Sequence, residues 1–172
     1  MRRQVNPKTA ADALRRASRL RPRLAIVLGS GFQSITQAMT VARAVPYAKL
    51  AGFPKPTVTG HTGQALIGTL SSTEILVLSG RAHYYEGHSL ETVTFPIRVL
   101  AEYGIENILL TNAAGGINKK FRAGEFMQFT DHLNFIGDNP LRGLHVTLAQ
   151  GRERFIDLSQ TYDTALNKAL QA

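Results

Sequence analysis

The sequence predicts an α/β protein with a mixed β-sheet flanked by helices. Two apolar runs, Leu24–Leu28 and Asn107–Thr111, have the pattern of strands buried on both faces. A helix-length segment, Leu90–Tyr103, precedes the second run, as expected for a crossover between parallel strands. Two further strands, Gln64–Leu70 and Glu74–Leu78, are joined by a short polar turn, so we expect them to pair antiparallel.

The chain length of 172 residues is sufficient for a hydrophobic core, and we expect a single α/β domain over residues 1–172. Apolar residues make up 44% of the sequence and charged residues 19%, which favours a globular protein over a disordered one. No apolar run reaches the roughly 18 residues that a membrane-spanning helix needs. We therefore expect a cytoplasmic protein without a membrane partner.

The charged and metal-ligating residues exclude some classes of site. There is no cysteine, which excludes disulfides and thiolate metal sites, and the five histidines are too scattered for a zinc site, so we predict no metal. The formal net charge of +8 fits either nucleic acid or an anionic small molecule. The arginines within residues 2–23 are not interleaved with aromatic residues, so we interpret them as a solvated helix face and predict no nucleic-acid partner.

Residues 1–21 are predicted to form an N-terminal helix that docks on the core, rather than the transit peptide that their arginines faintly resemble. Asn6 and Pro7 can open this helix, which we expect to run to about Leu20, before Pro22. Its apolar residues follow helical spacing, which supports docking on the core.

The first strand ends at Gly29-Ser30-Gly31, before a predicted helix over Phe32–Met39. This glycine-rich segment is either a simple strand-to-helix turn or an anion site formed by its amides and the Ser30 hydroxyl. Val41–Tyr47 is a further candidate strand, and Ala51–Thr59 is expected to be a loop. His61 follows this loop between glycines, where it can face a ligand or cap the turn.

The helix over Leu90–Tyr103 is expected to end at Gly104 and to pack on the sheet through one apolar stripe. The stripe consists of Val93, Ile97, Leu100 and Ala101. Further along, Phe126–Thr130 and His132–Ile136 are apolar and aromatic enough for two strands, and Gln160–Leu170 is expected to be a helix.

Three loops each follow a predicted buried strand: Gly29–Gly31, Gly80–Gly87 and Asn112–Gly116. If those strands are neighbours, the loops converge at one edge of the sheet, where open α/β sheets bind ligands. Arg81 offers a fork of donors suited to an oxyanion, and His83 can add a donor or a proton, so phosphate is the expected ligand. A surface ion pair for Arg81 and simple packing for His83 remain the structural alternatives.

Nucleophile-elbow, P-loop and dinucleotide-binding motifs do not occur in the sequence. The segments GSGF, TGHTG, GRAHYYEGHSLETVTFPIRVL, TNAAGGIN and DHLNF…NPLRG resemble, in this order, the trimeric class of purine nucleoside phosphorylases. The resemblance extends from about Leu24 to Asp163. It implies an α/β/α fold with a mixed sheet and the phosphate-dependent cleavage of purine (deoxy)nucleosides to free base and (deoxy)ribose 1-phosphate. It also implies a homotrimer in purine salvage, with inorganic phosphate as co-substrate and no metal or organic cofactor.

The same resemblance assigns roles to individual residues. The phosphate-binding residues that it implies are Ser30, His61, Arg81, His83 and the amide of Ala114. The nucleoside-binding residues that it implies are Tyr85, Ala113, Ala114 and Phe155, of which Phe155 reaches the ribose of a neighbouring subunit. His83 and Glu86 are the predicted catalytic residues, with Glu86 positioning His83 and its loop.

Members of this family continue well beyond the equivalent of Ala172, and the continuation carries their base-recognition residues. We therefore expect a chain truncated at the C-terminus that holds a phosphate and ribose half-site. Two alternatives stay open: an inactive remnant that binds phosphate or only assembles with other subunits, and a methylthioadenosine phosphorylase. The HYYEG segment resembles the inosine and guanosine branch better than the latter.

Overall fold

The computed structural model describes residues 5–54, 63–142, 146–147, 153–154 and 156–171. The chain divides into two units, residues 1–114 and 115–172, and each is described by itself. A single domain over residues 1–172 therefore stays a prediction.

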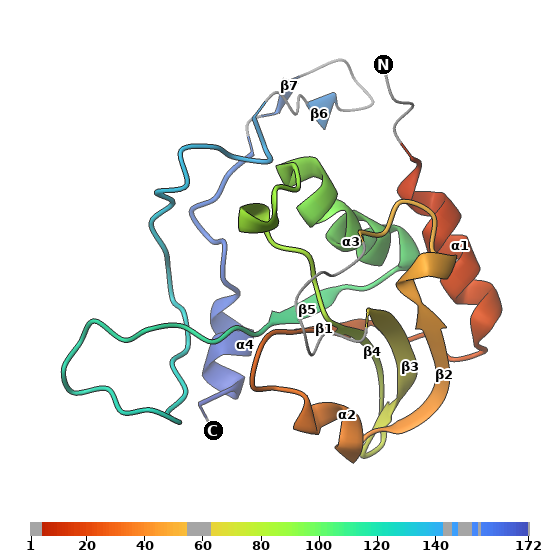
Figure 1. The fold of residues 1–172 in the computed structure, drawn as a ribbon, viewed down its shortest axis with the longest axis horizontal. Helices are drawn as coiled ribbons and strands as arrows, with labels where there is room; N and C mark the ends of the chain where they lie inside the picture. The colour runs from red at the N-terminus through yellow and green to blue at the C-terminus, as the bar shows by residue number, and fades with distance from the viewer. Residues whose placement is uncertain (1–4, 55–62, 143–145, 148–152, 155, 172) are drawn as a thin grey trace. The chain divides into compact units, whose positions relative to one another are not determined.

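The first unit is built on one five-stranded sheet with the strand order β2-β3-β4-β1-β5 (Figure 1). The strands are β1 (Leu24–Leu28), β2 (Thr40–Pro46), β3 (Gln64–Leu70), β4 (Thr73–Ser79) and β5 (Asn107–Leu110). Strand β1 pairs in parallel with both β4 and β5, whereas β2–β3 and β3–β4 are antiparallel. The predicted mixed sheet is confirmed, as are the hairpin and the parallel crossover. The prediction that Asn107–Thr111 is buried on both faces is wrong, because β5 is an edge strand of the described sheet, where Ile108 is 37% exposed and Leu110 is 61% exposed.

The described residues of this unit also form three α-helices and two short 3₁₀ helices. They are α1 (Pro7–Ala17), α2 (Ser34–Ala38), α3 (Leu90–Tyr103), η1 (Tyr47–Lys49) and η2 (Tyr84–Glu86). The Asn6 side chain caps α1 by accepting a hydrogen bond from the Lys8 amide. Helix α1 ends at Ala17, earlier than predicted, because Ser18 has extended dihedral angles.

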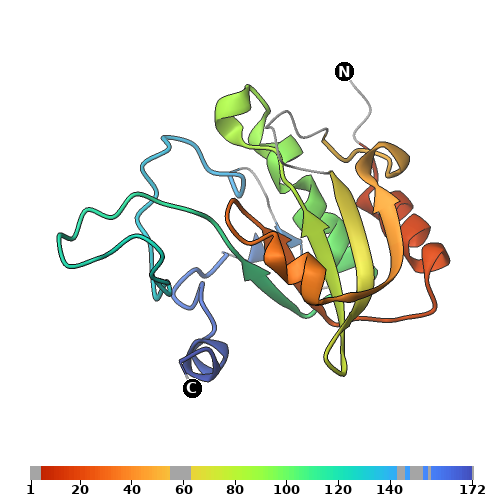
Figure 2. The ribbon, with the colours of Figure 1, turned by 60° about the horizontal axis from the view of Figure 1, so that its bottom comes forward.

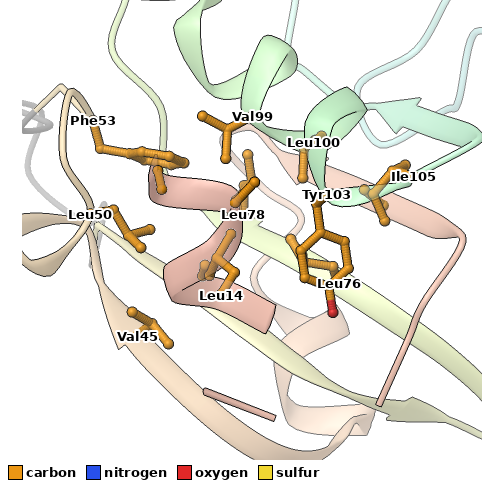
Figure 3. Packing of buried hydrophobic residues seen from close by; sticks show 14 of the residues in the cluster. Leu14, Val45, Leu50, Phe53, Leu76, Leu78, Val99, Leu100, Tyr103 and Ile105 are labelled. Atoms are coloured by element: carbon orange, nitrogen blue, oxygen red, sulfur yellow. The ribbon is translucent and has the colours of Figure 1, made fainter. Parts of the chain in front are cut away.

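Helices α1 and α3 lie on one face of the sheet and α2 lies on the other (Figures 1 and 2). Alternate residues of β1, β3 and β4 supply the two apolar layers, because successive side chains of a strand point to opposite faces. On the α1–α3 face, Leu14 and Val99 pack with Leu76 and Leu78 of β4 (Figure 3). On the α2 face, Ile75 and Val77 of the same strand belong to a second, smaller cluster. The unit is therefore an α/β/α layered structure.

The predicted core face of α3 needs a correction, although its bounds are as predicted. The buried residues of this helix are Phe95, Pro96, Val99, Leu100 and Tyr103. Of the predicted stripe, only Leu100 is buried, while Ala101 is exposed. The helix is rotated toward its large aromatic side chains because Phe95 and Tyr103 bury more apolar surface than Val93 or Ala101 can.

The second unit contains two short antiparallel strands, β6 (Val146–Thr147) and β7 (Glu153–Arg154), and helix α4 (Thr164–Ala169). Helix α4 begins later than predicted because Asp163 caps it, accepting hydrogen bonds from the amides of Ala165 and Leu166.

The predicted strands Phe126–Thr130 and His132–Ile136 are wrong, because this segment has no regular secondary structure. Phe126 is 87% exposed and Phe135 is 88% exposed. Their apolar pattern alone does not make a strand, because a strand also needs a neighbouring backbone to pair with.

Within the part of the chain that the structure describes, no helix is both long enough and apolar enough to span a membrane.

Candidate active site

The loops that follow β4, β1 and β5 leave the sheet at one edge, because these three strands are adjacent and parallel. Val27 of β1 pairs with Leu78 of β4 and with Leu110 of β5, so the strands end at nearly the same level. The structure thus brings together the first two predicted loops and the part of the third that ends at Ala114. Gly115 and Gly116, which the prediction included, belong to the second unit.

Gly29 and Thr111 lock the loop after β1 to the loop after β5. The Gly29 amide donates to Thr111 Oγ1 at 2.9 Å, and this hydroxyl donates to the Val27 carbonyl at 3.1 Å. A Cβ atom at Gly29 would lie only 2.3 Å from the Thr111 carbonyl oxygen and 2.7 Å from Asn112 Cα. The two backbones can therefore approach this closely only with glycine at position 29.

Arg81 connects the loop after β4 to the end of β5. Its Nη1 donates to the Thr111 carbonyl at 2.8 Å, and its Nε donates to His83 Nε2 at 3.3 Å. Within the described residues, these two bonds use two of the five N–H donors of the guanidinium, so others are left for an anion. Burial lowers the pKa of Arg81, and Tyr85 opposes part of that shift. Arginine still remains a cation at physiological pH.

Glu86 orients His83 through two contacts with the same carboxylate oxygen. The His83 amide donates to Glu86 Oε1 at 2.7 Å, and His83 Nδ1 lies 2.7 Å from the same atom. Because the Arg81 Nε–H can only donate, His83 Nε2 is the acceptor, which assigns the ring proton to Nδ1. The Glu86 side chain is 6% exposed, so its carboxylate is held in a largely dry position.

Tyr85 and His88 flank this pair. The Tyr85 ring stacks on the His83 ring with centroids 4.8 Å apart and an interplanar angle of 16°. Tyr85 itself is 76% exposed, so most of its surface remains open to a ligand. His88 Nε2 lies 4.0 Å from Glu86 Oε2, on the carboxylate oxygen that His83 does not use.

The remaining predicted site residues differ in what the structure describes of them. Ser30 is exposed in the loop after β1, and Ala113 and Ala114 are exposed in the loop after β5, at the same sheet edge as Arg81. His61 and Phe155 lie outside the described residues.

Two residues that contribute to this site were not found from the sequence. Thr111 was predicted only as the end of a strand. A polar residue at the end of an apolar strand does, however, indicate a possible hydrogen bond to a neighbouring loop. Tyr47 was also predicted only as the end of a strand, yet its hydroxyl donates to the Gly80 carbonyl at 2.7 Å. No local pattern indicates this contact, because Gly80 lies 33 positions away along the chain.

No group of three or more His, Asp or Glu side chains that could hold a metal ion occurs among the residues that the structure describes. The chemistry that this site offers comes from a half-buried arginine, a carboxylate-oriented histidine and loop amides. These groups are suited to binding an oxyanion.

Comparisons with known proteins show which family the chain resembles. The family model of the phosphorylase superfamily matches residues 23–172. Purine nucleoside phosphorylase 1 of Bacillus subtilis is 43% identical over 146 residues, which cover 85% of this chain and 53% of that protein. Purine nucleoside phosphorylase 1 of Geobacillus stearothermophilus is 40% identical over 159 residues, which cover 92% of this chain and 57% of that protein.

Solved structures of Schistosoma mansoni proteins share the fold. Isoform 2 of its purine nucleoside phosphorylase, in complex with cytosine and ribose-1-phosphate, matches with a TM-score of 0.80 and 35% identity, over 95% of this chain and 58% of that chain. Its purine nucleoside phosphorylase in complex with a monocyclic inhibitor matches with a TM-score of 0.83 and 34% identity, over 96% of this chain and 62% of that chain. The present chain spans about half the length of the curated relatives that it matches. Because the family model matches residues 23–172 and both sequence relatives and solved structures agree with it, the chain belongs to the phosphorylase superfamily.

Proposed function

We propose that this chain contributes the phosphate and ribose part of a purine nucleoside phosphorylase site. The observation that carries the proposal is the Arg81–His83–Glu86 arrangement at the carboxyl ends of three adjacent parallel strands, in a chain similar to purine nucleoside phosphorylases. The reaction is the phosphate-dependent cleavage of the N-glycosidic bond, giving free base and (deoxy)ribose 1-phosphate.

The phosphate ligands in this proposal are Arg81, His83, Ser30, the Ala114 amide and His61. The free N–H groups of Arg81 give charge-assisted hydrogen bonds to phosphate oxygens. His83 Nε2 accepts from the Arg81 Nε–H in the structure. Once that bond is released, it can accept from a hydrogen phosphate O–H, or donate when the ring is protonated. Glu86 holds the orientation of the imidazole through its contact with Nδ1 in both cases. His83 and Glu86 are the proposed catalytic pair.

The nucleoside contacts in this proposal are Tyr85, Ala113, Ala114 and Phe155. Tyr85 is exposed and stacked on His83, which supports a contact with the ribose directly above the phosphate. The small side chains of Ala113 and Ala114 let the loop backbone come close to the sugar and base. Phe155 is proposed to reach the ribose of a neighbouring subunit.

The chemistry follows from electrostatics and positioning. As the bond between C1′ and the purine nitrogen breaks, the base leaves with the bonding electrons and the sugar becomes cation-like. A phosphate held against C1′ stabilises this positive charge and forms the new C1′–O bond. No covalent enzyme intermediate is needed because phosphate is a free co-substrate, and we propose that no metal or organic cofactor takes part.

For the whole protein we propose a cytoplasmic homotrimer that acts in purine salvage on purine nucleoside and phosphate. The ribose-1-phosphate bound to the Schistosoma mansoni relative supports the sugar phosphate as product.

The test is inosine turnover by the purified chain with and without inorganic phosphate. Turnover only with phosphate supports the proposal, whereas phosphate binding without turnover of any purine nucleoside supports the inactive remnant.

Arg81→Ala is expected to weaken the affinity for phosphate at least tenfold, because hydrogen bonds to charged groups contribute about 1.5–3 kcal/mol each. The measurement is the KM for phosphate, or the Kd where turnover is absent. Arg43→Ala, which removes the same charge from an exposed position in the middle of β2, is the matched control. An Arg81→Ala variant with unchanged phosphate dependence would refute the assignment of Arg81.

A further inference from the structure

Tyr47 occupies a position where three strands of the sheet end together. Pro46 at the end of β2 pairs with Gln64 at the start of β3, and Gln64 pairs with Ser79 at the end of β4. Tyr47, Gly63 and Gly80 are therefore the first residues beyond the paired region on three adjacent strands.

Tyr47 makes a hydrogen bond to each of the two glycines. Its backbone amide donates to the Gly63 carbonyl at 2.8 Å, and its side-chain hydroxyl donates to the Gly80 carbonyl at 2.7 Å. The side chain thus reaches past β3 to the end of β4. Tyr47 is 3% exposed, so both bonds are shielded from competing water.

Both glycines lie where the backbone turns away from the sheet. Gly63 has φ of 61° and Gly80 has φ of 98°, values that side-chain-bearing residues rarely adopt. Arg81 follows Gly80 directly, so the direction of the chain at Gly80 sets the starting point of the arginine. The backbone alone does not fix this direction, since glycine tolerates a wide range of dihedral angles.

The tyrosine is suited to fixing that turn. Its ring is held by Phe53, with centroids 4.8 Å apart, so the hydroxyl is aimed by packing rather than by the hydrogen bond itself. Burial raises the pKa of Tyr47, so the hydroxyl stays a neutral donor over the physiological pH range. Phenylalanine at this position would keep the packing and remove only the donor.

We propose that Tyr47 is a positioning residue of the phosphate site, which ties the turns at Gly63 and Gly80 together and so aims Arg81 at the phosphate. This inference rests on the proposed function, because Arg81 is a phosphate ligand only within it.

The test compares Tyr47→Phe with Tyr103→Phe. Tyr103 is a matched control because it is 5% exposed in the same apolar cluster, and its hydroxyl donates to the Leu20 carbonyl at 3.1 Å. Isothermal titration calorimetry with inorganic phosphate, on the full chain, measures the Kd. We expect Tyr47→Phe to raise it about tenfold, which corresponds to the loss of roughly one buried hydrogen bond, and Tyr103→Phe to change it less than about twofold. Where the chain turns over inosine, the KM for phosphate rises by the same factor and the KM for inosine does not.

A second measurement separates this inference from the proposed function. In ¹H–¹⁵N spectra without phosphate, Tyr47→Phe is expected to shift the amide signals of Gly80 and Arg81, and Tyr103→Phe to leave them in place. If Tyr47→Phe left both the amide signals and the phosphate Kd unchanged, the positioning role of Tyr47 would be overturned and the proposed function would stand. An equal loss of phosphate affinity in Tyr47→Phe and Tyr103→Phe would have the same consequence. A wild-type chain without phosphate affinity would overturn the proposed function and the role of Tyr47 in phosphate binding, while the amide shifts would still decide whether Tyr47 sets the turn at Gly80.

Discussion

Gly29 marks the place where the loop after β1 comes closest to the loop after β5. Its amide hydrogen bond to Thr111 and the absence of a Cβ atom together allow the two backbones to touch. Arg81 donates to the carbonyl of the same threonine. A single residue without a side chain therefore sets the spacing of two of the three candidate site loops.

Gly29→Ala is expected to destabilise the protein by about 1–3 kcal/mol, because its methyl group would overlap the backbone of Thr111 and Asn112. The measurement is the free energy of unfolding from urea denaturation. Gly115→Ala is the matched control, because a Cβ atom there meets nothing within 4 Å, so a change of less than about 0.5 kcal/mol is expected. If both substitutions changed the free energy of unfolding equally, the backbone around Gly29 would have room for a methyl group.

Helices α1 and α3 pack against each other and together cover one face of the sheet. Leu14 of α1 is fully buried, in the same apolar cluster as Leu76 and Val99 (Figure 3). The two arginines of α1, Arg15 and Arg16, do not prevent this packing. They lie away from the buried stripe, as with exposed Arg16, or at its margin, as with Arg15, which pairs with Asp12 at 2.6 Å. The interpretation of the arginine cluster as a helix face holds for these two arginines. It is wrong for Arg19, Arg21 and Arg23, which are exposed but lie beyond the end of α1 at Ala17.

Leu14→Ala is expected to lower the free energy of unfolding by about 2–5 kcal/mol, since it leaves a cavity in a layer that holds α1 on the sheet. Thermal and urea denaturation measure the loss. Arg16→Ala, an exposed substitution in the same helix, is expected to change stability by less than about 0.5 kcal/mol. A Leu14→Ala variant as stable as Arg16→Ala would mean that α1 contributes little to the fold.

At the scale of the whole molecule, the buried apolar residues are concentrated in one part of the chain. Among the described residues, every member of the two core clusters lies between Ala10 and Ile105. From Gly115 to Gln171, no residue whose exposure is described is buried. Most of the hydrophobic stabilisation of this chain therefore belongs to the first unit.

Limited trypsin digestion is expected to cut first at Lys119, Lys120 or Arg122, which are exposed in a segment without regular secondary structure. Mass spectrometry of the early products identifies the cut, and a fragment that holds the five-stranded sheet should persist. Arg15 in α1 and Arg98 in α3 serve as internal controls, because cleavage there requires a helix to open. A first cut inside either helix would contradict the assignment of the stable core to the first unit.

The sequence by itself determined those parts of the protein that depend on local patterns. Continuous apolar runs followed by glycine or a polar turn were sufficient to predict β1, β3, β4 and the crossover helix α3, because buried strands and capped helices leave short-range signals. The same patterns predicted that the loops after β1, β4 and β5 carry the candidate site, with Arg81, His83 and Glu86 in one of them.

The tertiary structure decided what depends on partners distant in the sequence. It set which face of α3 is buried, and it left Phe126 and Phe135 exposed outside any strand, because neither packing nor strand pairing can be read from one segment alone. It also revealed the hydrogen bonds of Thr111 and Tyr47, whose partners lie 82 and 33 positions away. Residue type and spacing are local properties, whereas a hydrogen bond between loops exists only after the sheet has brought their ends together.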